Sequence, residues 1–105
     1  MSIEGRIDTE MSISEGLLMA SQGKKVVMVF DHHEWAFVEA VSMLPTVSES
    51  WKAKRIQRKI DFPKGGMIMF ITERQIGPHT GGARFDATNS NHPMLVPCLL
   101  DGAFQ

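Results

Sequence analysis

The sequence predicts a single small α/β domain, in which two main helices pack on a mixed sheet of about four strands. Three patterns carry this prediction. Residues 13–22 and a longer stretch beginning at Asp31 have the apolar spacing of amphipathic helices, residues 26–30 form an unbroken apolar run, and residues 54–72 have a hairpin pattern. At 105 residues, the chain is long enough for one core without disulfides or a structural metal.

The N-terminal residues 1–10 are polar and unpatterned, so we expect a flexible segment here, followed by a single domain over residues 11–105. The run Ile3-Glu4-Gly5-Arg6 matches the cleavage site of the protease factor Xa. The segment is therefore interpreted either as a remnant of an expression tag or, if the match is chance, as part of the natural chain.

The first helix is expected at residues 13–22. Ser12 or Ser14 can cap its free amides, and Glu15 in the first turn suits the positive end of the helix dipole. Gly23 follows as a typical C-terminal stop.

A buried parallel strand is expected over residues 26–30, because a run that is apolar at every position suits a strand covered on both faces. The second helix then begins at Asp31, which can cap its first amides while Glu34 reaches back, as in a capping box. Its end is expected near Met43, because Pro45 cannot donate the hydrogen bond of a helix interior.

The hairpin over residues 54–72 combines a basic first strand with an apolar second strand, Met67 to Ile71. Between them, Pro63 presets φ for a turn and Gly65 can adopt the left-handed conformation that closes it. The second strand is apolar on both faces, which predicts that the sheet is covered on both sides there.

The C-terminal part of the chain carries weaker signals. Residues 74–93 are polar and glycine-rich and are predicted to be irregular, which is typical of a binding loop or local disorder. Residues 94–100 predict a last strand, with Pro97 favouring an edge position or a bulge. The predicted core draws on every element: Leu18, Val27, Val29, Trp35, Val38, Val41, Ile60, Phe62, Ile68, Phe70 and Leu99.

The composition excludes several classes of protein. Cys98 is the only cysteine, so an intramolecular disulfide and a multi-cysteine zinc site are excluded. No apolar run approaches the roughly 18 residues of a membrane span, and no signal-peptide pattern opens the chain. We expect a cytoplasmic protein with no membrane partner and no cofactor.

The net charge of −1 hides a segregation of charge. Residues 1–50 carry eight acids and three bases, whereas residues 51–64 carry six bases and only Asp61 as an acid. One basic element on an otherwise acidic chain indicates a binding surface. Its candidate residues are Trp51, Lys52, Lys54, Arg55, Arg58, Lys59 and Lys64.

This basic strand has more than one interpretation. Alternation would place Arg55, Lys59 and Lys64 on one face, in a row that could follow a phosphate backbone, with Trp51 as a stacking surface. The same charges could dock on a protein or simply prevent an edge strand from pairing. We hypothesise a small non-enzymatic binding protein that docks on a protein partner, or self-associates, through the basic hairpin. Nucleic-acid binding through the same strand is the alternative.

A second alternative is a metal-dependent enzyme built on His32-His33-Glu34. With Asp31, this run follows the carboxyl end of a predicted parallel strand, where open α/β sheets bind ligands, and His79 or His92 could complete a metal shell. Adjacent histidines at a helix start point in different directions, and no His-x-x-x-His spacing is present. No metal site is therefore assigned, and His32 and His33 are kept as candidates only.

The order of elements also resembles a known family. A helix ending in Gly23-Lys24-Lys25, a strand, a helix, the hairpin and then Gly82-Ala-Arg-Phe-Asp86 are similar to the middle of a RecA-like P-loop NTPase core, as in phage terminase large subunits and helicases. The resemblance covers roughly residues 13–97. The chain lacks the phosphate-binding Gly-x-x-x-x-Gly-Lys-Ser/Thr motif and has Asn89-Ser-Asn-His92 where the acidic Walker B pair would be expected. The resemblance thus implies a protein of a phage or other mobile element that does not hydrolyse ATP.

Overall fold

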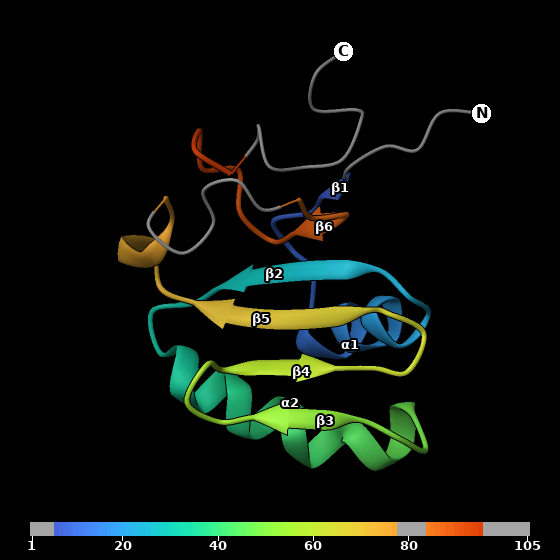
Figure 1. The fold of residues 1–105 in the computed structure, drawn as a ribbon. Helices are drawn as coiled ribbons and strands as arrows, with labels where there is room; N and C mark the ends of the chain where they lie inside the picture. Colours follow the sequence, from blue (N-terminus) through green and yellow to red (C-terminus); the bar gives the residue numbers. More distant parts are fainter. Residues whose placement is uncertain (1–5, 78–83, 96–105) are drawn as a thin grey trace, which may run out of the picture.

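The computed structural model describes residues 6–77 and 84–95. In this part of the chain it contains two helices, a short 3₁₀ turn and a mixed sheet whose six strands run in the order β1-β6-β2-β5-β4-β3 (Figure 1). The predicted α/β class is confirmed. The elements are β1 (Arg6–Ile7), α1 (Ile13–Ser21), β2 (Lys25–Val29), α2 (His33–Val47), β3 (Lys52–Lys54), β4 (Lys59–Asp61), β5 (Met67–Ile71), the 3₁₀ turn η1 (Glu73–Gln75) and β6 (Ala87–Thr88).

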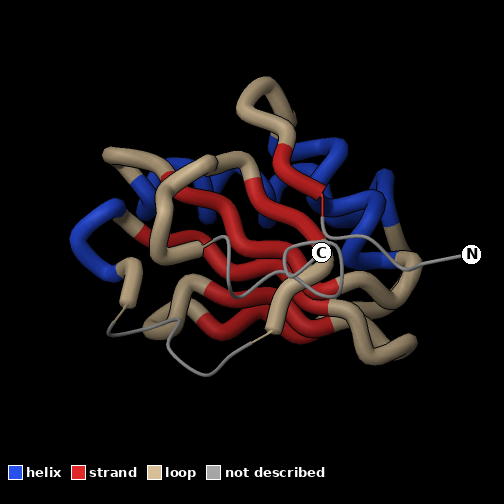
Figure 2. The backbone as a smooth tube through the Cα atoms, turned by 90° about the horizontal axis from the view of Figure 1, so that it is seen from above, coloured by secondary structure: helices blue, strands red, loops and turns tan. Residues whose placement is uncertain are grey.

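The sheet separates two apolar layers. Strands β1, β6, β2 and β5 are parallel, whereas β4 and β3 continue from β5 as an antiparallel meander. Both α-helices lie on one side of the sheet (Figure 2), and Ile76, Phe85 and Leu95 pack on the other side. The alternation of side chains along β2 and β5 divides their residues between these two layers.

The larger layer lies between the helices and the sheet. Its centre is Phe70, whose ring stacks with that of Phe30 and meets that of Phe37 edge to face, each at a centroid distance of 6.3 Å. Val26, Met28, Ile60 and Ile68 complete the sheet side, and Leu17, Ala20, Ala36, Ala40 and Leu44 complete the helix side. The smaller layer on the other side contains Val27, Ile71, Ile76, Phe85 and Leu95.

The first helix agrees with its prediction. The Ser12 hydroxyl accepts a hydrogen bond from the Glu15 amide (3.2 Å), and the Glu15 carboxylate accepts one from the Ser12 amide (3.1 Å), which makes a complete capping box. After the helix, Gly23 turns the chain at φ +101°. Local residue chemistry is therefore sufficient to define both ends of α1.

The second helix corrects its prediction at both ends. The helix begins at His33, preceded by His32 as a cap without a side-chain hydrogen bond, so Asp31 does not form the expected capping box. The helix also continues through Pro45 to Val47. Proline has a helical φ, but it loses its own hydrogen bond and its ring crowds the carbonyl four residues earlier. The fully buried Leu44 holds this last turn against the core and offsets that cost.

The basic half of the predicted hairpin is not one strand. It is divided into β3 and β4 by a turn over residues 55–58, in which the Arg58 amide donates to the Arg55 carbonyl oxygen (3.2 Å). Arg58 has φ +51°, an uncommon conformation for a side-chain-bearing residue. The following turn does agree with its prediction: Gly65 has φ +90°, and the Phe62 amide donates to the Gly66 carbonyl oxygen (2.9 Å).

The predicted core is partly confirmed. Val27, Ile60, Phe62, Ile68 and Phe70 are buried, Val29 and Val41 are half-buried, and Leu99 lies outside the described residues. Leu18, Trp35 and Val38 are exposed, so their prediction is wrong. For Trp35 and Val38, the reason is the composition of the buried face of α2. This face contains two small residues, Ala36 and Ala40, beside Phe37 and Leu44, whereas the prediction placed the larger Trp35 and Val38 in the core.

The C-terminal segment differs from its prediction. Met94 and Leu95 lie in a turn instead of opening a strand, and the rest of the predicted strand lies outside the described residues, as do residues 78–83 of the predicted irregular loop. The short strand β6 instead comes earlier and inserts between β1 and β2. Two polar side chains that flank β6 hold it there.

These flanking residues are Asp86 and Asn89, and each bonds the backbone of β2. At one end, the Lys25 amide donates to the Asp86 carboxylate (2.8 Å) and the Asp86 amide donates to the Lys25 carbonyl oxygen (2.7 Å). At the other end, the Asn89 side chain accepts from the Val29 amide (2.7 Å) and donates to the Val29 carbonyl oxygen (3.0 Å). A two-residue strand thus gains four hydrogen bonds beyond its own ladder.

Replacing Asn89 with alanine should destabilise the fold by about 1–3 kcal/mol, because the half-buried Val29 amide and carbonyl both lose their partner. Asn89→Asp should not rescue the loss, since a carboxylate would face the Val29 carbonyl oxygen without a donor. Urea denaturation followed by circular dichroism measures both variants. A midpoint equal to that of the wild type for either variant would contradict this role of Asn89.

The N-terminal strand β1 is not an element that the polar pattern of residues 1–10 predicts. Arg6 and Ile7 pair in parallel with Ala87 and Thr88 of β6. The Arg6 guanidinium lies 2.7 Å from the Asp8 carboxylate, and this hydrogen bond, aided by the Glu10 amide, lowers the pKa of Asp8. Residues 1–5 lie outside the described residues, and the tag interpretation stays a prediction.

Candidate functional site

The basic hairpin is less available for binding than its sequence indicates, because three of its six bases are in ion pairs. The Lys54 and Lys59 ammonium groups lie 3.0 Å and 3.6 Å from the two oxygens of the Asp61 carboxylate. The Arg58 guanidinium lies 2.7 Å from the Glu34 carboxylate on α2. Of the six bases of this segment, Lys52, Arg55 and Lys64 have no ion pair with a described residue.

The turn over residues 55–58 interrupts the row predicted for Arg55, Lys59 and Lys64, and the three bases without an ion pair are spread over both ends of the meander. Lys52 is paired in register with Asp61, and Lys64 follows three residues later, so both lie at one end of the meander. Arg55 is in the turn between β3 and β4, at the opposite end. The break in the strand interrupts the alternation on which a continuous basic face depends.

Trp51 is half-buried, and it packs against the larger apolar layer. Part of its surface is therefore used in packing. Its role as a stacking surface for a base stays a prediction.

Arg58 instead fixes the turn in place. Its guanidinium donates to the Arg55 carbonyl oxygen (2.6 Å) and pairs with Glu34, while its own carbonyl oxygen accepts from the Phe70 amide (2.9 Å). These contacts join the turn to α2 on one side and to β5 on the other. They offset the cost of the left-handed backbone conformation at Arg58.

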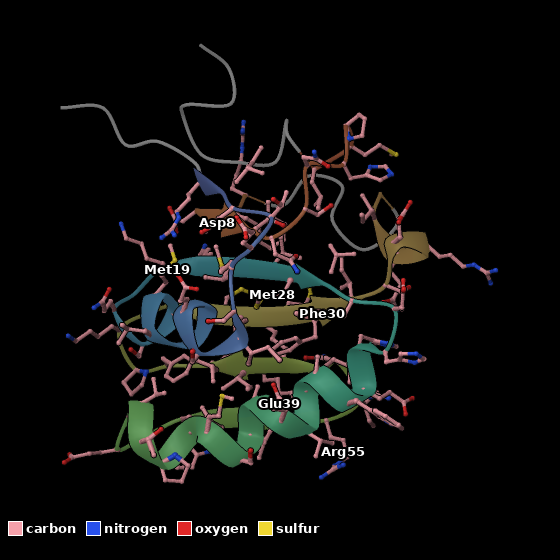
Figure 3. The ribbon with its side chains drawn as sticks, turned by 180° about the vertical axis from the view of Figure 1, so that it is seen from behind. Asp8, Met19, Met28, Phe30, Glu39 and Arg55 are labelled. Carbon is pink, nitrogen blue, oxygen red and sulfur yellow. The ribbon has the colours of Figure 1, made fainter. Side chains whose placement is uncertain are left out.

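The turn that Arg58 holds carries the most exposed large apolar side chain in the described residues. Ile56 is 93% exposed, and on α2 Val38, one helical turn after Glu34 of the Arg58–Glu34 ion pair, is 54% exposed. Figure 3 shows Arg55 beside the N-terminal half of α2. We call these three residues, Val38, Arg55 and Ile56, the turn–helix surface. Trp35 is 78% exposed but lines a different hollow, with Ile13 and His32.

The turn–helix surface also contains a hollow. A space of about 480 Å³ lies between the start of α2, the β3–β4 turn and the end of β5. Both polar and apolar residues line it, namely His33, Ile56, Gln57, Arg58, Lys59, Met69, Phe70, Ile71 and Gln75. Sequence reasoning missed this surface because it assigned Val38 to the core and residues 55–58 to a continuous strand.

The structure separates the residues of the histidine cluster. His33 lines the hollow just described, whereas the His32 ring lies against that of Trp35 at a centroid distance of 5.7 Å. Asp31 lies at the carboxyl edge of the sheet, in a cleft that it shares with His92. Among the described residues, no three of His, Cys, Asp and Glu gather in a group that could hold a metal ion, and His79 lies outside these residues.

Neither α-helix in the described part has the length and hydropathy needed to cross a lipid bilayer. Compared with known proteins, the chain matches no family model, no curated protein and no solved structure. Its function is therefore inferred from the geometry of its own residues.

Proposed function

We propose that this protein is a non-enzymatic binding module that docks on a protein partner through the turn–helix surface. The observation that carries the proposal is the exposure of Ile56 and Val38 beside Arg55, which has no ion pair among the described residues. Exposed apolar side chains beside an arginine are typical of the anchors of protein interfaces.

The same observation defines the chemistry of the partner. Ile56 and Val38 require an apolar recess in the partner's surface, and Arg55 requires a carboxylate close to that recess. The Arg58–Glu34 ion pair holds the turn against α2 before binding, so little conformational entropy is lost when the partner docks. We infer an acidic protein surface with an apolar pocket.

Nucleic-acid binding is less favoured as the function of the hairpin. Affinity for a phosphate backbone depends on several unpaired cations along one path. Asp61 and Glu34 pair with Lys54, Lys59 and Arg58 and offset two of their three positive charges, and the remaining bases lie at opposite ends of the meander. This arrangement supports a protein interface, where a single unpaired arginine beside apolar anchors is sufficient.

The test compares two double variants that change the charge by similar amounts, −3 and −4, at the two ends of the meander. Arg55→Glu/Ile56→Asp alters the turn–helix surface, and Lys52→Glu/Lys64→Glu is the matched control at the far end. A partner captured by the wild-type protein is purified and titrated calorimetrically. We expect the first variant to weaken binding by about 30-fold or more, as for the loss of an interface anchor. The control should bind within about threefold of the wild type.

The variant should fold normally, because Ile56 is almost fully exposed. Its melting temperature should remain within about 3 °C of the wild type. Equal partner affinity in both double variants would contradict the proposal. So would submicromolar binding of labelled DNA or RNA, measured by anisotropy, that falls steeply with salt and is lost in Lys52→Glu/Lys64→Glu.

A further inference from the structure

A second site lies at the carboxyl edge of the sheet, away from the β3–β4 turn. Strands β2 and β5 are parallel neighbours in which Val29 is paired with Ile71, so both end at the same edge (Figure 1). After β2 the chain enters α2 on the helix side, and after β5 it passes through η1 to the opposite side, where Ile76 packs. Neighbouring strands that exit to opposite sides leave a crevice between them, where open α/β sheets bind ligands.

The crevice is present as a cleft of about 570 Å³. Asp31 follows β2, while Thr72, Glu73 and Arg74 follow β5, and His92 closes the cleft from the segment after β6. A smaller hollow of about 350 Å³ continues from it along the end of β6 and shares Asp31 and Glu73 with the cleft. The segments that follow three strands, β2, β5 and β6, thus contribute residues to one open site.

The backbone around the cleft is held in place by hydrogen bonds. The Asn89 side chain bonds the end of β2, and the Thr72 amide donates to the Gln75 side chain (2.8 Å). The Met94 amide donates to Nδ1 of His92 (3.1 Å), so a neutral His92 ring carries its proton on Nε2 and has a donor to offer. The site is therefore ordered before a ligand arrives.

The charges in this cleft are not compensated. Within residues 6–77 and 84–95, none of the three charged residues Asp31, Glu73 and Arg74 forms an ion pair. Two carboxylates and one guanidinium therefore line the same space, together with the His92 ring. A complementary ligand has two cationic groups and one carboxylate.

We propose that this cleft binds a basic amino acid, with L-lysine as the simplest example. Asp31 and Glu73 receive the two ammonium groups, and Arg74 and His92 receive the carboxylate. The excess of carboxylates disfavours phosphate-bearing ligands such as nucleotides, which would be repelled by Asp31 and Glu73. The site is separate from the turn–helix surface and does not depend on the proposed docking function.

The binding test uses ¹H–¹⁵N NMR spectra of the full chain, titrated with L-lysine and three analogues at low salt. L-norleucine lacks the side-chain ammonium, cadaverine lacks the carboxylate, and L-glutamate has the opposite charge balance. We expect saturable shifts around Asp31, Thr72 and His92 with L-lysine, at a dissociation constant of about 0.1–10 mM for such open charged contacts. L-Norleucine and cadaverine should bind more weakly, and L-glutamate and ATP should not bind in the cleft.

Two variants assign the roles of the side chains. Arg74→Gln should weaken L-lysine binding about three- to tenfold and leave cadaverine binding unchanged, because cadaverine has no carboxylate for Arg74 to contact. Asp31→Asn should weaken both ligands. Glu49→Gln, outside the cleft, is the control and should change neither.

Three results would overturn the proposal. One is the absence of shifts at the cleft with about 20 mM L-lysine, a concentration above the expected dissociation constant. Another is equal loss of L-lysine and cadaverine binding in Arg74→Gln, which would mean general damage to the site. The third is tighter binding of L-glutamate or ATP than of L-lysine. Arg55→Glu/Ile56→Asp should bind L-lysine as the wild type does, so failure of the docking proposal leaves this test unaffected.

Discussion

The Gly66→Ala variant is expected to lose about 3 kcal/mol or more of its unfolding free energy. Gly66 follows the turn between β4 and β5, where the backbone passes directly against the end of α1. A Cβ atom there would collide with the Ala20 carbonyl oxygen and lie 2.9 Å from the Gly23 Cα, a distance that real Cβ contacts do not reach. Both obstacles are backbone atoms, so no side-chain rotation can relieve the contact.

Gly65→Ala is the matched control for this prediction. Gly65 has φ +90°, but a Cβ added there has no neighbour within 4 Å. Its replacement should therefore cost only the strain of a left-handed residue, about 1–2 kcal/mol. Urea denaturation of both variants gives the comparison. A loss for Gly66→Ala no greater than that for Gly65→Ala would show that α1 does not press on this turn.

Phe70→Ala should cost about 3–5 kcal/mol of unfolding free energy, which is a large part of the stability of a typical small domain. Phe70 is 1% exposed and is the residue at which Phe30 of the β2–α2 connection and Phe37 of α2 meet the sheet. Truncation leaves a cavity and removes both aromatic contacts. These contacts hold α2 on the sheet.

Because Phe70→Ala could fail to fold, Phe70→Leu gives a second measure. Leucine refills most of the cavity but makes no aromatic pair, so the loss should fall to roughly 1–2 kcal/mol. Ile56→Ala, an apolar truncation of a 93% exposed residue, should change stability by no more than about 0.5 kcal/mol. Equal losses for Phe70→Ala and Ile56→Ala would contradict the assigned core.

The sequence predicted the turn–helix surface only in part. The segregation of charge drew attention to the segment that includes Arg55 and Arg58. A helical wheel that gave Ala36 and Ala40 the weight of larger apolar residues would have turned Val38 outward. Nothing local indicated a turn over residues 55–58, because this segment has no glycine, proline or asparagine.

The sequence by itself determined the elements whose ends and faces depend on near neighbours. The Ser12–Glu15 capping box defines the start of α1, Gly65 closes the turn before β5, and the apolar run of β2 predicts its burial on both sides. In each case, the residues that interact are within a few positions of one another, or the pattern of a single element is sufficient.

Only the tertiary structure decided the features that join distant segments. Arg58 breaks the predicted strand because Glu34, on another element, stabilises its unusual backbone conformation. The two-residue strand β6 forms because Asp86 and Asn89 bond the backbone of β2, about 60 positions away in the chain. The cleft exists because β2 and β5 become neighbours whose chains exit to opposite sides. Local propensity carries no information about such contacts, since their free energy arises only after the whole sheet has assembled.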